Sequence, residues 1–219
     1  MPELSAFLAA SLTFARSLST IELHFDDHRL LTLNRQTYDE QPLILNHLKL
    51  CLFSPKRLMR IISTTIQPVE IKASYIALMH ENFQPVADPM VRTEPTAHLE
   101  VAKAKVSISV SDDFAANFQR ATKKPPPSQT VISIVGSIDR GSGDSGQDQL
   151  FADLMPTTQG KVYIGFPTHQ TTGFAGHFAA PALVPTVERE SIDLADPFMK
   201  EWNIELLSSV GNFARFGLY

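Results

Sequence analysis

Two long runs of β-forming residues constrain the fold most. Leu58–Met79 is interrupted by Pro68, which predicts either two strands with a break or one strand with an edge position. Ala97–Val110 alternates apolar and polar residues for most of its length, which is the period of a half-buried strand. One side of this second strand is expected to carry the apolar residues Leu99, Val101, Val106, Ile108 and Val110.

Helices are predicted at both ends of the chain. Residues 1–18 and 197–216 both space their apolar residues with a helical period. Residues 19–138 are expected to hold strands and one helix, Asp112–Lys124, for which Ser111 is a suitable N-cap. We therefore predict an α+β fold over residues 1–219, a single β-rich domain or domain fragment. Its sheet is expected to be curved and mostly antiparallel, with helices packed on one face.

Residues 160–194 form the segment richest in side-chain chemistry. Lys161–Phe166 is predicted to be a strand, and Pro167–Gly173 a loop that presents hydroxyl and imidazole groups. Phe174–Val184 is apolar and is expected to form a second strand. Residues 139–149, just before this segment, are rich in Gly, Ser and Asp and are predicted to be a flexible loop.

A single arginine is the main candidate for phosphate chemistry. Arg189 lies between Glu188 and Glu190 in a predicted loop ahead of the C-terminal helix. An arginine held between carboxylates at the end of a strand can reach a phosphate on a neighbouring domain. The alternative is a surface ion-pair cluster that closes the sheet.

Composition excludes several classes of partner. The net charge is −4, whereas proteins that bind duplex nucleic acid usually carry a surplus of positive charge. No apolar run approaches the roughly 20 residues that span a membrane, so no membrane partner is expected. Cys51 is the one cysteine, which rules out an internal disulfide and fits a reducing intracellular compartment, the cytoplasm above all. Its apolar neighbours predict a buried position.

Three further motifs carry little weight. Asp139–Gly143 matches the D-x-G-x-G element of GHKL-type ATP sites, but no helix with Glu and Asn precedes it. His98 and Ser145 are residue types of a hydrolase, yet they are too close in sequence for two barrels. His24 and His28 are metal-ligand types on a predicted strand–turn–strand, where they do not converge. We therefore expect no metal site, and no enzymatic activity of the chain alone.

Long blocks of the sequence resemble one family. GKVYIGFPTHQTTGFAGHFAAPALVPTVERESIDL resembles a segment of large fungal sacsin-like proteins, which carry an ATPase region related to the ninety-kilodalton heat-shock chaperones. The resemblance extends to LAASLTFARSLSTIELHFDDHRLLTLN, FQRATKKPPPS and WNIELL, and so spans most of the chain in order. In sacsin the corresponding block has an F-x-P-x-x-x-x-T-G core. Pro167 and Thr172-Gly173 match its P-x-x-x-x-T-G part, and Phe166 stands directly before Pro167.

The resemblance implies that this chain is one segment of a larger protein. It places this chain after an N-terminal GHKL nucleotide domain, as a middle or transducer-like segment that couples nucleotide state to conformation. Val187-Glu188-Arg189-Glu190 is similar to the end of a chaperone loop whose arginine reaches the γ-phosphate of ATP. Pro185 stands four residues before this arginine, where the chaperones have five. Arg189 is thus expected to sense phosphate, and Thr171, Thr172 and Gly173 to contact a ligand.

Cofactors and partners follow from the same resemblance. No cofactor is expected on this chain, while ATP and magnesium belong to the parent protein. The expected partners are the nucleotide domain and client proteins, and Met1 is then an internal methionine or the start of a fragment. The competing interpretation is a stand-alone protein-interaction module that uses its sheet or its C-terminal helix, which bears Trp202 and Leu206.

Overall fold

A computed structural model of the chain describes residues 2–15, 17–44, 52–76, 92–137, 151, 154, 156 and 158–217. The helices within these residues are α1 (Pro2–Phe14), α2 (Asp112–Thr122) and α3 (Pro197–Gly217). The strands are β1 (Thr20–Phe25), β2 (His28–Thr37), β3 (Gln41–Pro42), β4 (Met59–Ile76), β5 (Arg92–Thr93), β6 (Thr96–Ile108), β7 (Gln129–Ser137), β8 (Lys161–Tyr163), β9 (Pro167–Thr171) and β10 (Phe178–Ala179).

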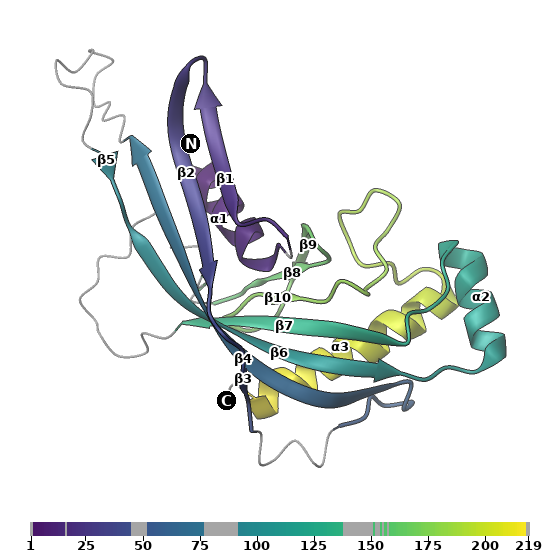
Figure 1. Cartoon of the computed structure of the whole chain (residues 1–219). Helices are drawn as coiled ribbons and strands as arrows, with labels where there is room; N and C mark the ends of the chain where they lie inside the picture. Colours follow the sequence, from purple (N-terminus) through teal and green to yellow (C-terminus); the bar gives the residue numbers. More distant parts are fainter. Residues whose placement is uncertain are drawn as a thin grey trace.

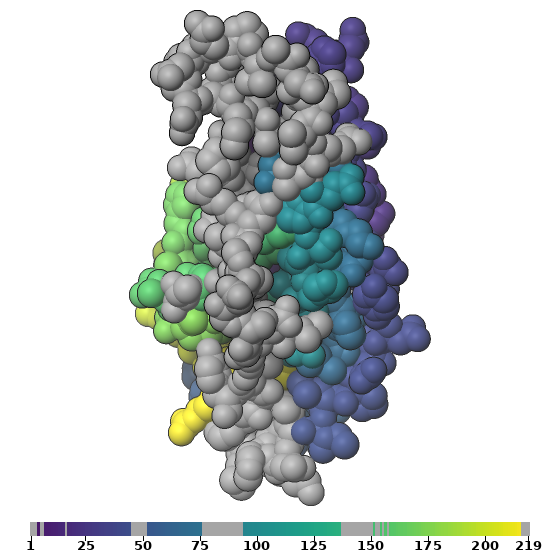
Figure 2. Space-filling view, turned by 90° about the vertical axis from the view of Figure 1, so that its left-hand side faces the viewer, coloured from purple at the N-terminus to yellow at the C-terminus, as the bar shows by residue number. Residues whose placement is uncertain are grey.

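All ten described strands belong to one curved sheet (Figure 1). Its order is β1-β2-β4-β6-β7-β10-β8-β9, with β3 and β5 paired to β4. Every described pairing is antiparallel except that of β10 with β8. In a view from the side, the N-terminal strands and the β8–β10 region lie at opposite edges (Figure 2). The predicted α+β class with a mostly antiparallel sheet is confirmed.

The sheet buries different faces at its two ends. Along β6, Leu99 and Val101 belong to one buried cluster, whereas Ala102, Ala104 and Val106 belong to another. Because successive side chains of a strand point to opposite faces, these two clusters lie on opposite sides of the sheet. The prediction that Leu99 and Val101 share a side with Val106 and Ile108 was therefore wrong. The apolar pattern changes phase at Val101–Ala102, and the strand stays continuous.

Strand β4 makes the same change of face by a β-bulge. Ile61 pairs with Val106 and Ser63 with Lys105, so Ile62 is the extra residue. One extra residue reverses the face of every side chain that follows. Met59 and Ile61 therefore join the core on one face, while Val69, Ile71 and Ala73 join the core on the other.

The helices cover the apolar part of each face of the sheet. Helices α2 and α3 pack on the face that carries Ala104 and Ile132, which we call the α3 face. Helices were predicted on one face of the sheet, and this holds for α2 and α3 but not for α1. Helix α1 packs on the opposite face, the α1 face, against residues such as Leu33 and Ile71. The rings of Phe14 and Tyr163 lie 4.5 Å apart there. The N-terminal helix thus has a separate core, which the sequence pattern did not reveal.

The strands within residues 160–194 lie at other positions than predicted. Of the predicted strand Lys161–Phe166, Lys161–Tyr163 forms β8. Pro167–Thr171, expected to lie in a loop, forms β9 and pairs with β8 in a hairpin. In the apolar segment Phe174–Val184, Phe178 and Ala179 are the residues in a named strand, and they insert between β7 and β8. Residues 139–149, with Asp139 and Ser145, lie outside the described residues.

Pro68 lies inside β4, which is one continuous strand of 18 residues. Its carbonyl accepts a hydrogen bond from the Tyr38 backbone N at 3.1 Å. At this point the neighbour of β4 changes from β3, at Thr65 and Ile66, to β2, at Val69. A proline is tolerated there because its missing N–H faces the interval between two neighbouring strands.

A buried carboxylate ties α3 to the loop that precedes β4. Glu205 is 2% exposed and accepts hydrogen bonds from the Ser54 hydroxyl at 2.5 Å and from the Lys56 backbone N at 3.0 Å. The Leu58 backbone N also donates to it, at 3.3 Å. One helix residue therefore satisfies three donors of a loop about 150 positions earlier in the chain.

Replacement of this carboxylate is expected to weaken the whole fold. Glu205→Ala leaves buried donors without acceptors and should lower the free energy of unfolding by about 2–4 kcal/mol. The control is Glu201→Ala, one turn earlier on α3, where the side chain pairs with Lys56 Nζ at 2.8 Å near the surface. That change should cost less than about 1 kcal/mol. Urea unfolding of both variants is the measurement, and equal losses would contradict the role given to Glu205.

Candidate functional site

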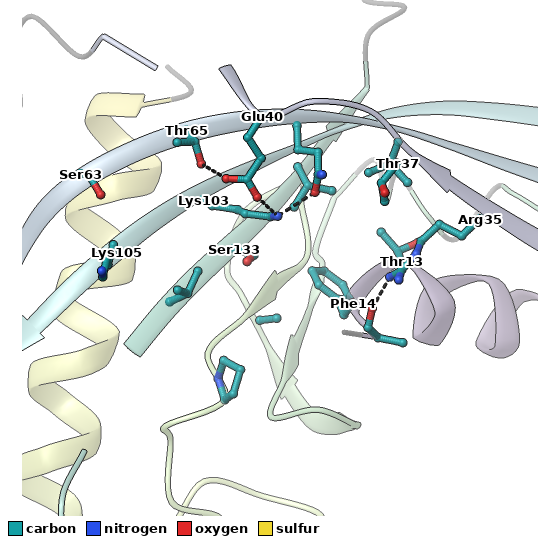
Figure 3. Close-up of a pocket in the computed structure, with 17 residues that line it drawn as sticks. Thr13, Phe14, Arg35, Thr37, Glu40, Ser63, Thr65, Lys103, Lys105 and Ser133 are labelled. Atoms are coloured by element: carbon teal, nitrogen blue, oxygen red, sulfur yellow. Dashed lines mark hydrogen bonds and ion pairs between the residues drawn. The ribbon is translucent and has the colours of Figure 1, made fainter. Parts of the chain in front are cut away.

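The part of the α1 face that the described residues leave uncovered forms a concave groove of about 570 Å³ (Figure 3). Its floor consists of β2, β4, β6 and β7, and the end of α1 closes it on one side. We call it the sheet groove. Its polar lining consists of Thr13, Arg35, Thr37, Glu40, Ser63, Thr65, Gln67, Lys103, Lys105 and Ser133.

A hydrogen-bond network, exposed in part and half-buried in part, lies in the groove. The Lys103 ammonium donates to Glu40 Oε1 at 2.5 Å and to Gln67 Oε1 at 2.7 Å. The Thr65 hydroxyl donates to the second Glu40 oxygen at 3.1 Å. The hydrogen bond from Lys103 lowers the pKa of Glu40 below its ordinary value of 4.5. Glu40 is therefore an ionised carboxylate at neutral pH, and it neutralises Lys103.

Arg35 fixes the end of α1 at the edge of the groove. Its guanidinium donates to the carbonyl oxygens of Leu12, at 2.9 Å, and of Ala15. A cation at the C-terminus of a helix satisfies orphan carbonyls and opposes the negative end of the helix dipole. Burial lowers the pKa of Arg35, yet an arginine stays charged at neutral pH. The sequence analysis did not identify this contact.

Lys105 adds a charge that the described part of the chain does not neutralise. It lies two residues after Lys103 on the same strand and is exposed. Figure 3 shows it apart from the Glu40–Lys103 pair. Arg35, Lys103 and Lys105 oppose the single carboxylate of Glu40 in the groove. This surplus of positive charge, with several hydroxyl groups around it, suits an anionic ligand.

The predicted ligand residues Thr171, Thr172 and Gly173 lie at the end of β9 on the other side of the molecule. The Thr172 hydroxyl lies 2.8 Å from the Phe174 carbonyl oxygen and 2.9 Å from that of Gly176, either of which can accept its one proton. It accepts a hydrogen bond from the Gly160 backbone N at 3.2 Å. Gly173 has a φ of +75°, which few other residues adopt. This geometry assigns Thr172 and Gly173 a role in shaping the turn.

Arg189 lies at the tip of a hairpin that extends from the body of the protein. Its backbone N donates to the Thr186 carbonyl at 3.0 Å, which closes a turn, and its φ is +62°. Arg189 is exposed, and the neighbouring Val187 is 93% exposed. The guanidinium makes no ion pair with Glu188 or Glu190 within the described residues, and the nearest basic partner of Glu190 is His169, at 3.9 Å.

The base of this hairpin is held firmly by α3. Asn203 has no exposed surface and donates to the carbonyls of Val184, at 2.9 Å, and of Asp193, at 2.8 Å. It also accepts a hydrogen bond from the Val184 backbone N at 2.8 Å. One amide side chain therefore binds both strands of the hairpin. The neighbouring Trp202 donates to the Ala182 carbonyl at 2.7 Å.

The remaining candidate residues do not converge on a site. His24 pairs with Glu22 at 3.2 Å and His98 faces Glu70 at 3.5 Å, far from each other in the sheet. His177 is buried and accepts a hydrogen bond from the Lys161 backbone N. Among the described residues no group of three or more His, Cys, Asp or Glu can hold a metal ion. Cys51 lies outside the described residues.

Trp202 and Leu206 are fully buried in the core between α3 and the sheet.

The part of the chain that the structure describes contains no helix long and apolar enough to span a membrane.

Sequence reasoning missed the sheet groove, although its signal is present. Lys103 and Lys105 continue the face that Leu99 and Val101 begin on β6. An apolar face that turns into lysines in the middle of a central strand indicates that its cover ends there. The sequence of β6 alone did not predict the groove, because a strand face that is polar over half its length also occurs where the strand simply faces solvent.

The fold and the groove define an open single-sheet α+β protein with a cationic concave surface. One family model, described as "Protein of unknown function (DUF3684)", matches residues 12–87 and 77–218. Since these residues are most of the chain, the chain belongs to this family. No curated protein matches the sequence, and no solved structure matches it.

The Glu40–Lys103 pair is expected to make stability depend on pH. Because the pKa of Glu40 is lower in the folded chain, the pair stabilises the fold above pH 4.5 and loses this effect as pH falls below that value. The Glu40 side chain is 43% exposed, so its contribution at pH 7 should be less than about 1 kcal/mol. Urea unfolding of wild type and Glu40→Gln between pH 3 and 7 measures it. A difference that persists in a Lys103→Met background would contradict the assignment.

Proposed function

We propose that this chain is the middle, transducer-like segment of a sacsin-like ATPase. Arg189 would reach the terminal phosphate of ATP held by a GHKL nucleotide domain of the same protein. ATP and magnesium would bind that domain, and this chain would supply the guanidinium and no catalytic activity alone. The sequence blocks described above support the proposal, and the lone cysteine is compatible with a reducing compartment inside the cell.

The observation that carries the proposal is the presentation of Arg189. Its side chain is exposed and without an ion pair among the described residues, on a hairpin whose base Asn203 binds. A guanidinium on a rigid support can donate two parallel hydrogen bonds to a phosphate, with little further ordering. An ion-pair cluster with Glu188 and Glu190 is disfavoured, because neither carboxylate pairs with it.

The backbone of Arg189 adds a second reason. A non-glycine residue with φ near +60° costs about 1–2 kcal/mol relative to the right-handed regions, and glycine or asparagine would relieve most of this strain. Strained residues cluster at functional sites. At Arg189 this backbone strain coincides with an exposed guanidinium that has no ion pair among the described residues.

Coupling would follow from closure of the nucleotide domain over the hairpin. The guanidinium would stabilise the charge that develops on the transferred phosphoryl group. After hydrolysis the anionic partner is lost, and the contact weakens. Because Asn203 joins the hairpin to α3, the change would pass to the helix and to the sheet beneath it.

The decisive variant is Arg189→Gly, which removes the guanidinium and relieves the backbone strain. In the longest natural polypeptide that contains this chain and hydrolyses ATP, kcat is expected to fall by roughly 10²–10³-fold. The KM for ATP should stay within about twofold, since the nucleotide pocket is elsewhere. Thermal unfolding should show equal or higher stability, so lost activity is not lost folding.

Arg57→Gly is the matched control. Arg57 is also exposed and has a φ of +63°, but it lies over the Phe53 ring and far from the hairpin in the sequence. It should leave kcat unchanged. Undiminished turnover in Arg189→Gly would remove the arginine role, and a transcript that encodes no GHKL domain beside this chain would remove the proposal as a whole.

The sheet groove favours a second candidate function, a protein-interaction module that uses its sheet. The groove is concave, uncovered among the described residues and positively charged. It would hold an extended acidic segment of a partner, whose carboxylates would face Lys105 and the hydroxyls of Ser63 and Ser133. Trp202 and Leu206 are buried, so they offer no contact surface for the version of this function that uses the C-terminal helix.

A hexaglutamate peptide tests the groove directly. Lys105→Glu reverses a charge that has no ion pair among the described residues. It should weaken binding of the peptide at least tenfold, which corresponds to about 1.4 kcal/mol. Lys200→Glu, an exposed lysine on α3, makes the same change in net charge elsewhere and should alter the Kd less than twofold. Titration calorimetry at low salt is the measurement. Equal effects of the two variants would mean that the peptide responds to the net charge of the protein and does not bind in the groove.

A further inference from the structure

The two edges of the sheet differ in how they are covered. At one edge, β9 begins with Pro167, and the His169 backbone N donates to the Glu190 carbonyl at 2.8 Å, so the Arg189 hairpin lies against this edge. At the other edge, β1 pairs with β2, and no further described strand pairs with it (Figure 1). Strand β1 has the sequence TIELHF, without the proline or lysine that commonly protects an open edge. Such an edge can accept another strand.

The backbone groups that β1 presents at this edge follow from its pairing with β2. The Arg35 backbone N donates to the Ser19 carbonyl at 2.7 Å, directly before β1. Because hydrogen-bonded and non-hydrogen-bonded pairs alternate in an antiparallel ladder, every second residue from there directs its N–H and C=O toward β2. The ladder has one irregularity, in which Leu30 of β2 is the extra residue, so β1 keeps its own alternation. Glu22 and His24 therefore direct their backbone groups outward.

In one antiparallel register, β1 is complementary to a second copy of itself. With Leu23 opposite Leu23 of the partner subunit, Glu22 stands opposite the partner's His24. In the same register, Ile21 stands opposite the partner's Phe25. The two pairs of Glu22 with the partner's His24 then form about four backbone hydrogen bonds, and a carboxylate opposite an imidazole is a favourable cross-strand pair. The neighbouring register with matching faces places the two Glu22 carboxylates opposite each other, which is destabilising.

The same register also joins apolar side chains of the two copies. Ile21 packs against the core of the α1 face, and Phe25, on the same side of β1, is 66% exposed. In the pair, Phe25 would cover the partner's Ile21. Glu22 and His24 lie on the opposite face, where Glu22 keeps its contacts within the chain, with Arg29 at 3.1 Å and with His24 at 3.2 Å. The pairing therefore requires no free charge.

We propose that β1 pairs antiparallel with β1 of a second copy of this chain, so that two sheets join into one across a two-fold axis. A two-fold contact uses the same patch of both copies, as the register of β1 with itself requires. A single pair of short strands is a small interface, so the dimer is weak and reversible. Strand β1 does not line the sheet groove, and it lies at the opposite edge from β9 and the Arg189 hairpin. The dimer is thus independent of both candidate functions.

Sedimentation equilibrium of the full chain, up to submillimolar concentration, tests the proposal. Wild type is expected to show a reversible equilibrium between monomer and dimer. His24→Glu places like charges opposite each other in the dimer, and the Kd should rise at least tenfold. Within the chain this position lies opposite Arg29, so folding is retained. The matched control is His28→Glu, the same change at an exposed position of β2, which should alter the Kd less than threefold.

Two further variants test the register and the backbone pairing. Glu22→His combined with His24→Glu restores opposite charges across the pair and should return the Kd to within about threefold of wild type. Glu22→Pro removes an N–H that does not face β2, so it should abolish the dimer while thermal unfolding stays cooperative. A wild type that remains monomeric over the whole range would overturn the proposal. So would a dimer that His24→Glu and Glu22→Pro leave unchanged, because its interface would lie elsewhere, and failed rescue by the double variant would overturn the register.

Discussion

The ladder between β4 and β6 is the constraint on which the rest of the structure depends. Thirteen residue pairs join these two central strands, and their side chains alternate between two faces that are apolar at opposite ends. Helix α1 covers the apolar end of one face, and α2 with α3 covers that of the other. The sheet groove is the polar remainder of the α1 face. Its position follows from where the apolar pattern changes phase.

The strands and helices were largely predictable, while the faces and the groove were not. Local patterns indicated the β1–β2 hairpin, the Ser111 cap of α2 and the helix α3, because each depends on residues close in sequence. The assignment of Leu99 and Val106 to opposite faces depends on counting residues through a strand, and the bulge at Ile62 depends on a partner strand. Arg35 and Glu205 act across long separations in the chain, which no local pattern records.

The candidate site illustrates the same limit. Arg189 was identified from its residue type and its neighbours, yet its left-handed backbone and its lack of an ion pair with Glu190 are properties of the folded hairpin. Pro167–Thr171 was expected to be a loop because it is polar and begins with proline. It forms β9 because an edge strand tolerates both features and pairs on one side only.

Asn203 has a mechanical consequence. Its side chain forms hydrogen bonds with both strands of the hairpin, and its neighbours Trp202 and Leu206 are fully buried in the core. Beside its contact with β9, where the His169 backbone N donates to the Glu190 carbonyl at 2.8 Å, the hairpin is joined to α3, a helix of 21 residues and about 30 Å. A displacement at the tip requires the helix to slide over the sheet, a shear motion. Such a motion is small in amplitude, and it would also act on the loop before β4, which Glu205 holds two residues further along α3.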